Sequence, residues 1–234
     1  MDASSLEAEK ERLIRLLKDA GFLRSERVER AFRAVPREEF VPRELRSMAY
    51  VDRPLPIGFS QTISAPSIVV YMTEVLDVRT GMKVLEVGTG SGYQAAILAE
   101  IVAPREEPRS SWGHVWTIEI VEELARRARE NLERTGYSDR VTVIVGDGSL
   151  GYPSEAPYQR IMVTAASPQV PKPLIEQLEV GGKMVVPVGD LVSQTLVLVE
   201  KKPEGIESRS MLDVVFVPLR GEHGWRNSET RPLV

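Results

Sequence analysis

The residues with the clearest chemical meaning are a glycine-rich run, Gly88-Thr89-Gly90-Ser91-Gly92, and the acids on either side of it in the chain. An apolar, β-branched segment (83–87) leads directly into this run, and a segment with helical spacing (93–102) follows it. A strand, a glycine-rich turn and a helix N-terminus together bind nucleotides, because glycines let the backbone approach the ligand and N–H groups face it. We therefore predict a nucleotide site at this turn.

The spacing of the glycines indicates the class of nucleotide. The dinucleotide fingerprint requires G-x-G-x-x-G, and its third glycine would fall on Tyr93, so a nicotinamide-dependent dehydrogenase is the least favoured enzyme. No Lys-Ser or Lys-Thr pair follows the glycines, which excludes a phosphate-binding P-loop. The run reads G-x-G-x-G, with Glu86 two residues ahead of it.

Two further acids follow the next two predicted strands. Glu119 lies near the end of segment 115–120, where a carboxylate can accept hydrogen bonds from both ribose hydroxyls of a nucleoside. Asp147, followed by Gly148, comes after segment 141–145 and could accept from an adenine amino group. Together with Glu86 and the glycine run, these acids resemble the S-adenosylmethionine (AdoMet) methyltransferases, so we predict AdoMet as the cofactor. The alternative is a turn whose glycines only relieve crowding and whose acids cap helices.

Composition limits the chemistry that remains. The chain has 234 residues, no cysteine and two histidines, His114 and His223, which excludes a thiolate nucleophile and multi-histidine metal sites. Its net charge of -4 gives no global case for nucleic-acid binding. No apolar run approaches the roughly 20 residues of a membrane span, and residues 1–13 lack a signal-peptide layout. We expect a soluble, cytoplasmic protein with no metal site and no nucleic-acid or membrane partner.

The elements around these motifs predict an α/β fold. Seven short β-branched runs are predicted as strands: 83–87, 115–120, 141–145, 160–164, 183–188, 195–200 and 214–219. Helices are predicted between several of them, at 93–102, 121–134 and 171–178. Near-continuous apolar strands separated by helices indicate a Rossmann-like, doubly wound, mostly parallel seven-stranded sheet. No helical pattern separates the last strands, which favours an antiparallel hairpin at one edge.

The remaining segments predict an N-terminal helical appendage and a short tail. Residues 6–50 have helical spacing, and a further helix is expected to start near Pro66. The stretch 52–58 (DRPLPIG) is rich in Pro and Gly and is predicted to be a loop, as is 103–113. We therefore divide the chain into a helical region with a substrate loop, an AdoMet-binding core and a polar tail, at 1–80, 81–220 and 221–234.

The segment LPIGFSQTISAP (55–66) resembles one family of these methyltransferases. LPIG followed by QTIS and Pro66 is the signature of the protein L-isoaspartyl O-methyltransferase family. Further matches occur in the family's order over about residues 20 to 220: VPREEFVP (35–42), VLEVGTGSGYQAAILA (84–99), VGDG (145–148), VTAA (163–166), LEVGGKMVVPVG (178–189) and FVPL (216–219). Family members usually read GQTIS, and Ser60 replaces that glycine here. The resemblance implies methyl transfer to the free α-carboxylate of L-isoaspartyl residues in damaged proteins and peptides, with S-adenosylhomocysteine as the product.

The resemblance also assigns residues to roles. Ser64 corresponds to the family's active-site serine, and Thr62 and Ile63 help to wall the methyl-donor pocket. We expect the substrate peptide to lie extended along the 55–64 loop and near Val217, contacting Ile57, Gln61, Thr62, Ser64 and Val217. Taken alone, Ser64 would be interpreted as a helix cap, because it lies just before Ala65-Pro66. The two roles are compatible.

The expected chemistry suits a chain with few catalytic side chains. An α-carboxyl group has a pKa of about 3.3–3.7, so more than about 99% of it is ionised at pH 7 and no general base is required. Orientation alone can lower a barrier by roughly 7–11 kcal/mol. We therefore expect Ser64 to position the carboxylate as a hydrogen-bond donor. Two alternatives stay open: an AdoMet methyltransferase for a small molecule or RNA, and a non-catalytic AdoMet-binding module whose N-terminal helices bind a partner protein.

Overall fold

The N-terminal third of the protein is helical in the computed structural model, which describes residues 3–226. Its elements are α1 (Ala3–Asp19), α2 (Glu26–Ala34), the 3-10 turns Arg37–Glu39 and Arg43–Met48, and α3 (Pro66–Leu76). The helical pattern predicted for 6–50 is confirmed in part, since regular helix ends at Ala34 and short turns follow. Helix α3 begins at Pro66, as predicted.

A two-stranded antiparallel hairpin precedes α3, formed by β1 (Leu55–Gly58) and β2 (Gln61–Ile63). The loop predicted for 52–58 is therefore wrong in its second half. Leu55 and Ile57 are buried while Pro56 and Gly58 are exposed, and a small edge hairpin tolerates proline because not every N–H must pair. The chain reverses through Phe59 and Ser60, whose φ angles of 55° and 56° lie in the left-handed region.

The other strands form one seven-stranded sheet in the order β5-β4-β3-β6-β7-β8-β9. They are β3 (Lys83–Val87), β4 (His114–Glu119), β5 (Val141–Val145), β6 (Tyr158–Val163), β7 (Leu178–Gly189), β8 (Gln194–Lys202) and β9 (Gly205–Val214). The first five strands of this order are parallel, and β8 pairs antiparallel with both β7 and β9. The predicted mostly parallel sheet with an antiparallel edge is confirmed.

The seventh strand is not the predicted segment 214–219. Strand β9 lies earlier in the chain, is exposed along most of its length and is polar, so it carries no apolar alternation that could have revealed it. The apolar segment 216–219 instead runs beside the residues that follow β6. There the N–H of Ala166 donates to the carbonyl of Val217 (2.8 Å), and that of Leu219 donates to Ala166 (2.7 Å).

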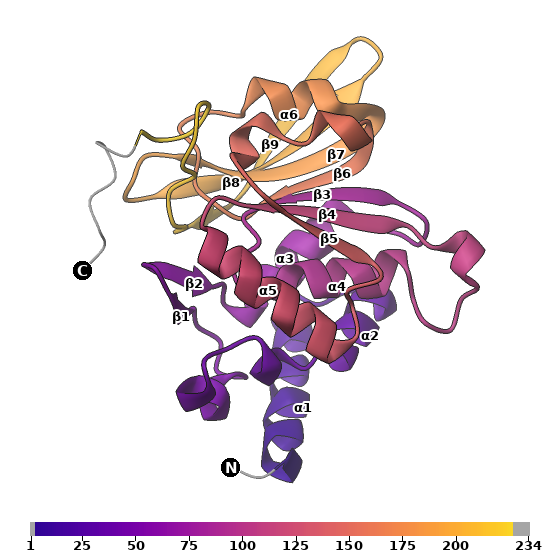
Figure 1. Cartoon of the computed structure of the whole chain (residues 1–234), viewed down its shortest axis with the longest axis vertical. Coiled ribbons are helices and arrows are strands. Elements are labelled where there is room, and N and C mark those ends of the chain that lie inside the picture. The colour runs from indigo at the N-terminus through magenta and orange to yellow at the C-terminus, as the bar shows by residue number, and fades with distance from the viewer. Residues whose placement is uncertain (1–2, 227–234) are drawn as a thin grey trace.

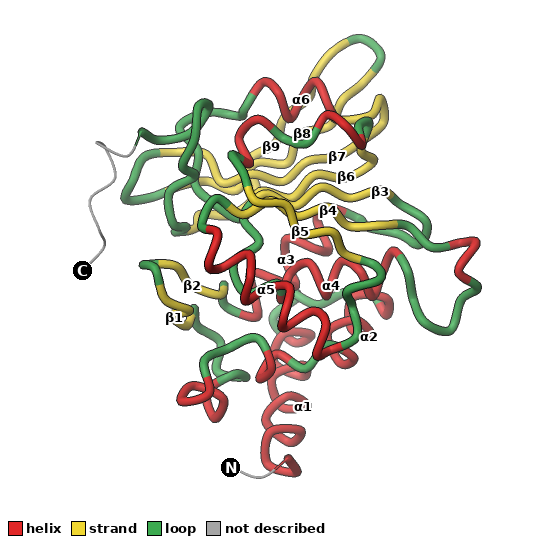
Figure 2. The backbone as a smooth tube through the Cα atoms, viewed as in Figure 1, coloured by secondary structure: helices red, strands yellow, loops and turns green. Residues whose placement is uncertain are grey.

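Helices cover both faces of the sheet (Figures 1 and 2). Helices α4 (Tyr93–Val102) and α5 (Glu122–Thr135) lie on the same side as α1–α3, and α6 (Lys172–Gln177) lies on the other. One apolar core lies between the N-terminal helices and one face of the sheet. A second core lies between α6 and the opposite face, whose side chains alternate with those of the first along each strand. The predicted division at residues 80 and 220 stays a prediction, although the first core crosses residue 80.

None of the helices within residues 3–226 is both long and apolar enough to cross a membrane. Of the predicted tail, residues 221–226 fold back on the sheet end, where the N–H of Trp225 donates to the carbonyl of Leu219 (2.7 Å). Residues 227–234 lie outside the described part of the chain.

Candidate active site

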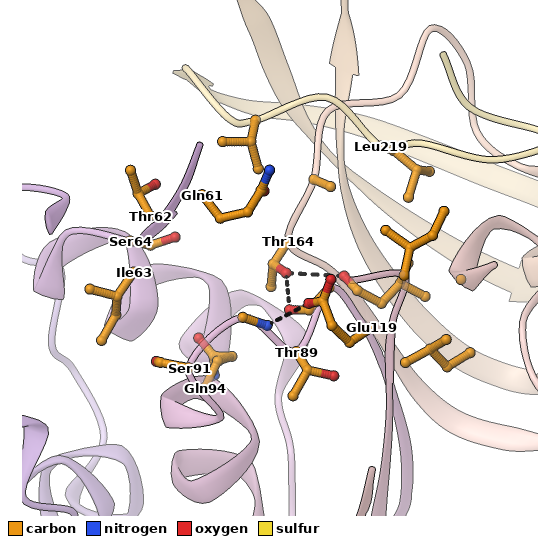
Figure 3. A pocket seen from close by; sticks show the side chains of 18 of the residues that line it. Gln61, Thr62, Ile63, Ser64, Thr89, Ser91, Gln94, Glu119, Thr164 and Leu219 are labelled. Atoms are coloured by element: carbon orange, nitrogen blue, oxygen red, sulfur yellow. Dashed lines mark hydrogen bonds between the residues drawn. The ribbon is translucent and has the colours of Figure 1, made fainter. Parts of the chain in front are cut away.

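A cleft with about 910 Å³ of empty space, part of it open to solvent, lies at the carboxyl ends of the parallel strands. This is the edge at which open α/β sheets bind ligands, and its size suits a small-molecule site. Most of the residues predicted for the site line it: Gln61, Thr62, Ile63, Ser64, Gly88, Thr89, Gly90, Ser91, Glu119, Gly148 and Val217. Figure 3 shows Thr62 and Ser64 on one side, Thr89 and Glu119 on the other, and Thr164 between them.

The glycine run forms the turn between β3 and α4, and its backbone is held in place from two sides. The N–H groups of Gly88 and Thr89 both donate to the carbonyl of Ile118 at the end of β4 (2.9 and 3.2 Å). The Thr164 hydroxyl, which follows β6, donates to the carbonyl of Gly88 (2.7 Å). Gly88 has a φ of 99°, and a Cβ there would clash with the Thr164 hydroxyl, so glycine is required at this position.

Glu119 faces the glycine run across the cleft and is 6% exposed. One carboxylate oxygen accepts from the N–H of Gly90 (2.8 Å), and the other accepts from the N–H of Val121 (3.0 Å). Each carboxylate oxygen has a second lone pair, so both can also accept from a ligand. The acceptors of this wall therefore fit a nucleoside with two ribose hydroxyls, next to the apolar side chains of Ile118 and Ile120.

Glu86 is fully buried beneath the glycine run and does not line the cleft. Its Oε2 accepts from the Thr117 hydroxyl (2.5 Å), which in turn lies 2.7 Å from the Thr89 hydroxyl. Its Oε1 is buried and has no hydrogen-bond partner within residues 3–226. Burial raises the pKa of Glu86 to about 8, against the lowering effect of the Thr117 hydrogen bond and with a smaller raising effect from Glu119. Glu86 therefore supports the turn from below, and its contact with a cofactor stays a prediction.

Asp147 is also set back from the cleft, although its neighbour Gly148 lines it. Its Oδ1 accepts from the N–H (2.9 Å) and the hydroxyl (2.6 Å) of Ser149. Its Oδ2 accepts from the N–H of Glu222 (2.7 Å), and the Ser149 hydroxyl accepts from the N–H of His223 (3.0 Å). Asp147 thus fixes the C-terminal segment to the sheet end, and its predicted bond to adenine stays a prediction.

A second cavity, with about 460 Å³ of empty space, lies beside the first. Apolar residues provide much of its lining, among them Pro54, Ile68, Val214, Val215 and Phe216. Four residues line both cavities, and they come from segments far apart in the sequence: Thr62, Ser64, Thr164 and Val217. The two cavities therefore meet at these four residues, with Ser64 among them.

The Ser64 hydroxyl is free to act at this junction. Ala65, rather than Ser64, is the N-cap of α3, and no side chain of the cap residue bonds to the helix. The carboxylate of Asp52 instead accepts from the N–H of Ser67 (2.9 Å). Within the described chain the Ser64 hydroxyl has no hydrogen-bond partner, so Ser64 does not serve as a helix cap.

Two predicted residues, Ile57 and Gly92, contact the elements that form the cleft without lining it. The Ile57 side chain packs on the glycine run, with its Cδ1 3.4 Å from where a Cβ on Gly90 would lie. Gly92 is the N-cap of α4 and lies against Ala128 and Leu132 of α5. Neither residue lines the cleft, and the predicted contact between Ile57 and a substrate stays a prediction.

Several lining residues were missed by the sequence reasoning, among them Tyr93, Gln94, Thr164, Leu219 and Arg220. Signals for some of them were present: Thr164 lies within VTAA, and Leu219 ends FVPL. Among the described residues that line the cleft, Glu119 and Arg220 are the only charged ones. The arrangement can therefore orient ligands and offer hydroxyl donors, but it supplies no histidine or lysine to remove a proton.

Comparison with known proteins agrees with this geometry. The family model described as "Protein-L-isoaspartate(D-aspartate) O-methyltransferase (PCMT)" matches residues 8–224. The chain is 62% identical to protein-L-isoaspartate O-methyltransferase of Hyperthermus butylicus, over 93% of this chain and 91% of that one. It is 56% identical to the protein of the same name from Staphylothermus marinus, over 96% and 99%.

Solved structures carry the same name. One protein-L-isoaspartate O-methyltransferase structure aligns with a TM-score of 0.80 at 31% identity, covering 92% of this chain and 67% of that one. A protein of this family from Plasmodium falciparum, solved in complex with S-adenosyl-L-homocysteine, aligns with a TM-score of 0.79 at 25% identity, over 91% and 98%. The likeness therefore extends beyond the sheet to most of the chain.

Proposed function

The chain belongs to the protein-L-isoaspartate(D-aspartate) O-methyltransferase family, and from this premise we propose that it methylates the free α-carboxylate of L-isoaspartyl residues in damaged proteins and peptides. The observation that carries the proposal is the junction of the two cavities at Ser64, beside Thr62, Thr164 and Val217. One cavity has acceptors for the ribose hydroxyls of a nucleoside, and the other, which has both apolar residues and hydroxyls in its lining, suits a peptide. A group held in each would meet at the serine.

AdoMet, when bound, supplies the methyl group. We assign its ribose to the Glu119 carboxylate, because both oxygens keep acceptor capacity after binding the N–H groups of Gly90 and Val121. Gly88, Thr89 and Ser91 border the space beside it, and Thr62 and Ile63 close the cleft from the hairpin. Gly148 lines the far end, where we propose that adenine lies near Asp147.

In this proposal the Ser64 hydroxyl donates a hydrogen bond to the substrate carboxylate. A carboxylate oxygen attacks the methyl carbon, so one C–O bond forms, one C–S bond breaks and no proton moves. The substrate carboxylate is already ionised at neutral pH, which agrees with a cleft whose lining within residues 3–226 has no histidine or lysine. The residues contribute alignment, which is worth roughly 7–11 kcal/mol when the reacting atoms are well oriented.

Recognition of isoaspartate must depend on shape, since isoaspartate and aspartate each present one carboxylate. We propose that the peptide lies extended in the second cavity, along Gln61–Ile63 and Val217, so that only the displaced backbone of isoaspartate brings its α-carboxylate to Ser64. We further propose a cytoplasmic enzyme without nucleic-acid or membrane partners. The net charge of -4 supports the absence of a nucleic-acid partner.

The test is transfer of labelled methyl from AdoMet to an isoaspartyl peptide beside its aspartyl twin. The proposal expects base-labile label in the isoaspartyl peptide and none above background in the twin. Equal label in both peptides would contradict recognition by shape. Label in neither, with S-adenosylhomocysteine bound, would favour a non-catalytic module or a methyltransferase for another acceptor.

A further inference from the structure

Arg37 is the largest side chain that is completely buried, with 0% exposure, and it lies close to the proposed reaction centre. It follows Pro36 at the start of a 3-10 turn, outside the cofactor-binding fold. No carboxylate forms an ion pair with it within residues 3–226. Removing a charge from water without pairing it is costly, and burial lowers the pKa of this guanidinium. Burial of this unpaired charge lowers the stability of the fold, so the contacts that Arg37 makes need an explanation.

The guanidinium of Arg37 connects three segments. Its Nε donates to the carbonyl of Ala49 (2.8 Å), and its Nη2 donates to the carbonyl of Ser64 (2.7 Å). Its central carbon lies 5.0 Å from the ring centroid of Tyr93, and Phe40 packs edge-on against the same ring at 5.5 Å. Arginine suits this arrangement because its donors lie on separate nitrogens of one planar group whose flat face can meet a ring, whereas a lysine carries all its donors on one nitrogen and has no planar face.

These contacts link the two sides of the site. Ser64 is one of the residues at which the cavities meet, and Tyr93 is the first residue of α4, directly after the glycine run. The turn between Ser64 and Ser67 is fixed at one end by Arg37 and at the other by Asp52. One buried side chain therefore contacts both the backbone of the serine and the first residue after the glycine run.

We propose that Arg37 is a positioning residue that sets the placement of Ser64 relative to the glycine run, and so aligns the substrate carboxylate with the methyl donor. The inference rests on the proposed function. Arg37 touches neither ligand, since it does not line either cavity, and it acts through the backbone of Ser64 and the ring of Tyr93. Misplacing a reacting group by about 1 Å can cost about 10²-fold in rate.

The chain contains a matched control in Arg140, a second buried arginine, at 1% exposure. Arg140 also stacks on a tyrosine, with 4.3 Å to the Tyr137 ring, and also donates to main-chain carbonyls, those of Ala103 and Gly136. It differs in having a carboxylate partner, Glu100 at 3.2 Å, and in lying away from both cavities. A purely structural role would make the two arginines equivalent.

The experiment compares Arg37→Lys with Arg140→Lys. Thermal unfolding, S-adenosylhomocysteine affinity, and kcat and KM for an isoaspartyl peptide are measured for both variants and for the wild type. We expect both variants to lose stability and to bind S-adenosylhomocysteine within about threefold of wild type. Only Arg37→Lys loses kcat, by about 10²-fold. Wild-type kcat in Arg37→Lys, or an equal fall in Arg140→Lys, overturns the inference.

Chemical rescue provides the second measurement. Arg37→Ala leaves a guanidinium-sized cavity, so millimolar ethylguanidinium should raise the kcat of this variant at least tenfold. The kcat of Arg140→Ala should not change. Rescue of both variants, or of neither, contradicts a positioning role.

A further variant serves if the Arg37 variants do not fold. Tyr93→Leu removes the ring that the guanidinium contacts and is expected to lower kcat more than S-adenosylhomocysteine affinity. A larger loss of affinity than of kcat counts against the inference. An inactive wild type would refute the proposed function itself, whereas an active wild type confines any failure to Arg37.

Discussion

The two walls of the cleft are built in different ways. The cofactor wall consists of turns at the ends of parallel strands, and each turn is fixed by the neighbouring strand, as when Gly88 and Thr89 donate to Ile118. The substrate wall is a hairpin of two strands, β1 and β2, outside the main sheet, followed by the turn at Ser64. Besides the packing of Leu55, Ile57 and Ile63 in the core, the turn at Ser64 is held by single side chains, Arg37 and Asp52, that reach it from other segments.

This difference predicts that cofactor binding and substrate alignment can be changed independently. The cofactor wall is part of the sheet, so its geometry exists as soon as the sheet forms. The substrate wall can shift as a unit when one side-chain contact is lost, because no sheet hydrogen bonds join it to β3–β9. Changes to the first wall should therefore weaken cofactor binding, and changes to the second should lower turnover while cofactor binding stays intact.

The largest effect is expected from Glu119→Ala. The variant loses two charge-assisted hydrogen bonds to a ribose, each worth about 1.5–3 kcal/mol, and leaves the N–H groups of Gly90 and Val121 unpaired. S-adenosylhomocysteine should bind at least about 10²-fold more weakly by calorimetry. Glu122→Ala, at an exposed position in the first turn of α5, is the control and should bind normally. Normal binding by Glu119→Ala would refute the assignment of the ribose site.

The next effect is expected from Ser64→Ala. Loss of one hydrogen bond to a carboxylate costs about 1.5–3 kcal/mol, so kcat for an isoaspartyl peptide should fall by about 10- to 10²-fold. S-adenosylhomocysteine affinity should stay within twofold, since the hydroxyl serves the other wall. Ser67→Ala, three residues further along, is the control and should keep its rate. An unchanged kcat in Ser64→Ala would favour a non-catalytic module.

A smaller effect concerns stability within the cofactor wall. The pKa of Glu86 rises from an ordinary 4.5 to about 8 on folding, so the folded protein binds the extra proton between these pH values. Its contribution to stability is thus complete below pH 4.5 and is lost as the pH rises toward 8. Glu86→Gln mimics the protonated acid and should gain stability over wild type as the pH rises through this window. Denaturant unfolding from pH 5 to 9 measures this gain, and a pH-independent difference between the two proteins would contradict it.

The smallest effect is expected at the tip of the substrate hairpin. Ser60 has a φ of 56°, and the left-handed conformation costs a non-glycine residue roughly 1–2 kcal/mol. Glycine relieves this cost but loses about 0.5–1 kcal/mol through backbone entropy. Ser60→Gly should therefore stabilise the protein by no more than about 1.5 kcal/mol, while Ser60→Ala, which keeps the strain, should not. Equal stability changes in the two variants would show that the turn is not strained.

The cofactor wall could be predicted from the sequence because its signals are local. The strand Lys83–Val87, the glycine run and the helix Tyr93–Val102 are consecutive, and their predicted bounds agree with the structure. Glu119 ends β4 as expected. The edge strand β9 was not predicted, because a polar edge strand lacks the apolar alternation that identifies buried strands.

The substrate wall was harder to predict because its contacts are distant in the sequence. The resemblance identified QTIS, but the strand at Leu55–Gly58 was predicted as a loop on the strength of its proline and glycine. Arg37 lies within VPREEFVP, and its partners lie 12, 27 and 56 residues further along. The bond between Asp147 and Glu222 spans 75 residues. No local pattern encodes such pairs.

The most direct test of this account is a crystal structure of the protein with S-adenosylhomocysteine and an isoaspartyl peptide bound together. The account predicts ribose hydroxyls on the Glu119 carboxylate and the isoaspartyl α-carboxylate within about 3 Å of the Ser64 hydroxyl. It also predicts that the peptide occupies the apolar cavity beside Val217. A peptide carboxylate bound away from Ser64, with the nucleoside still on Glu119, would contradict the claim that the two walls meet at this serine.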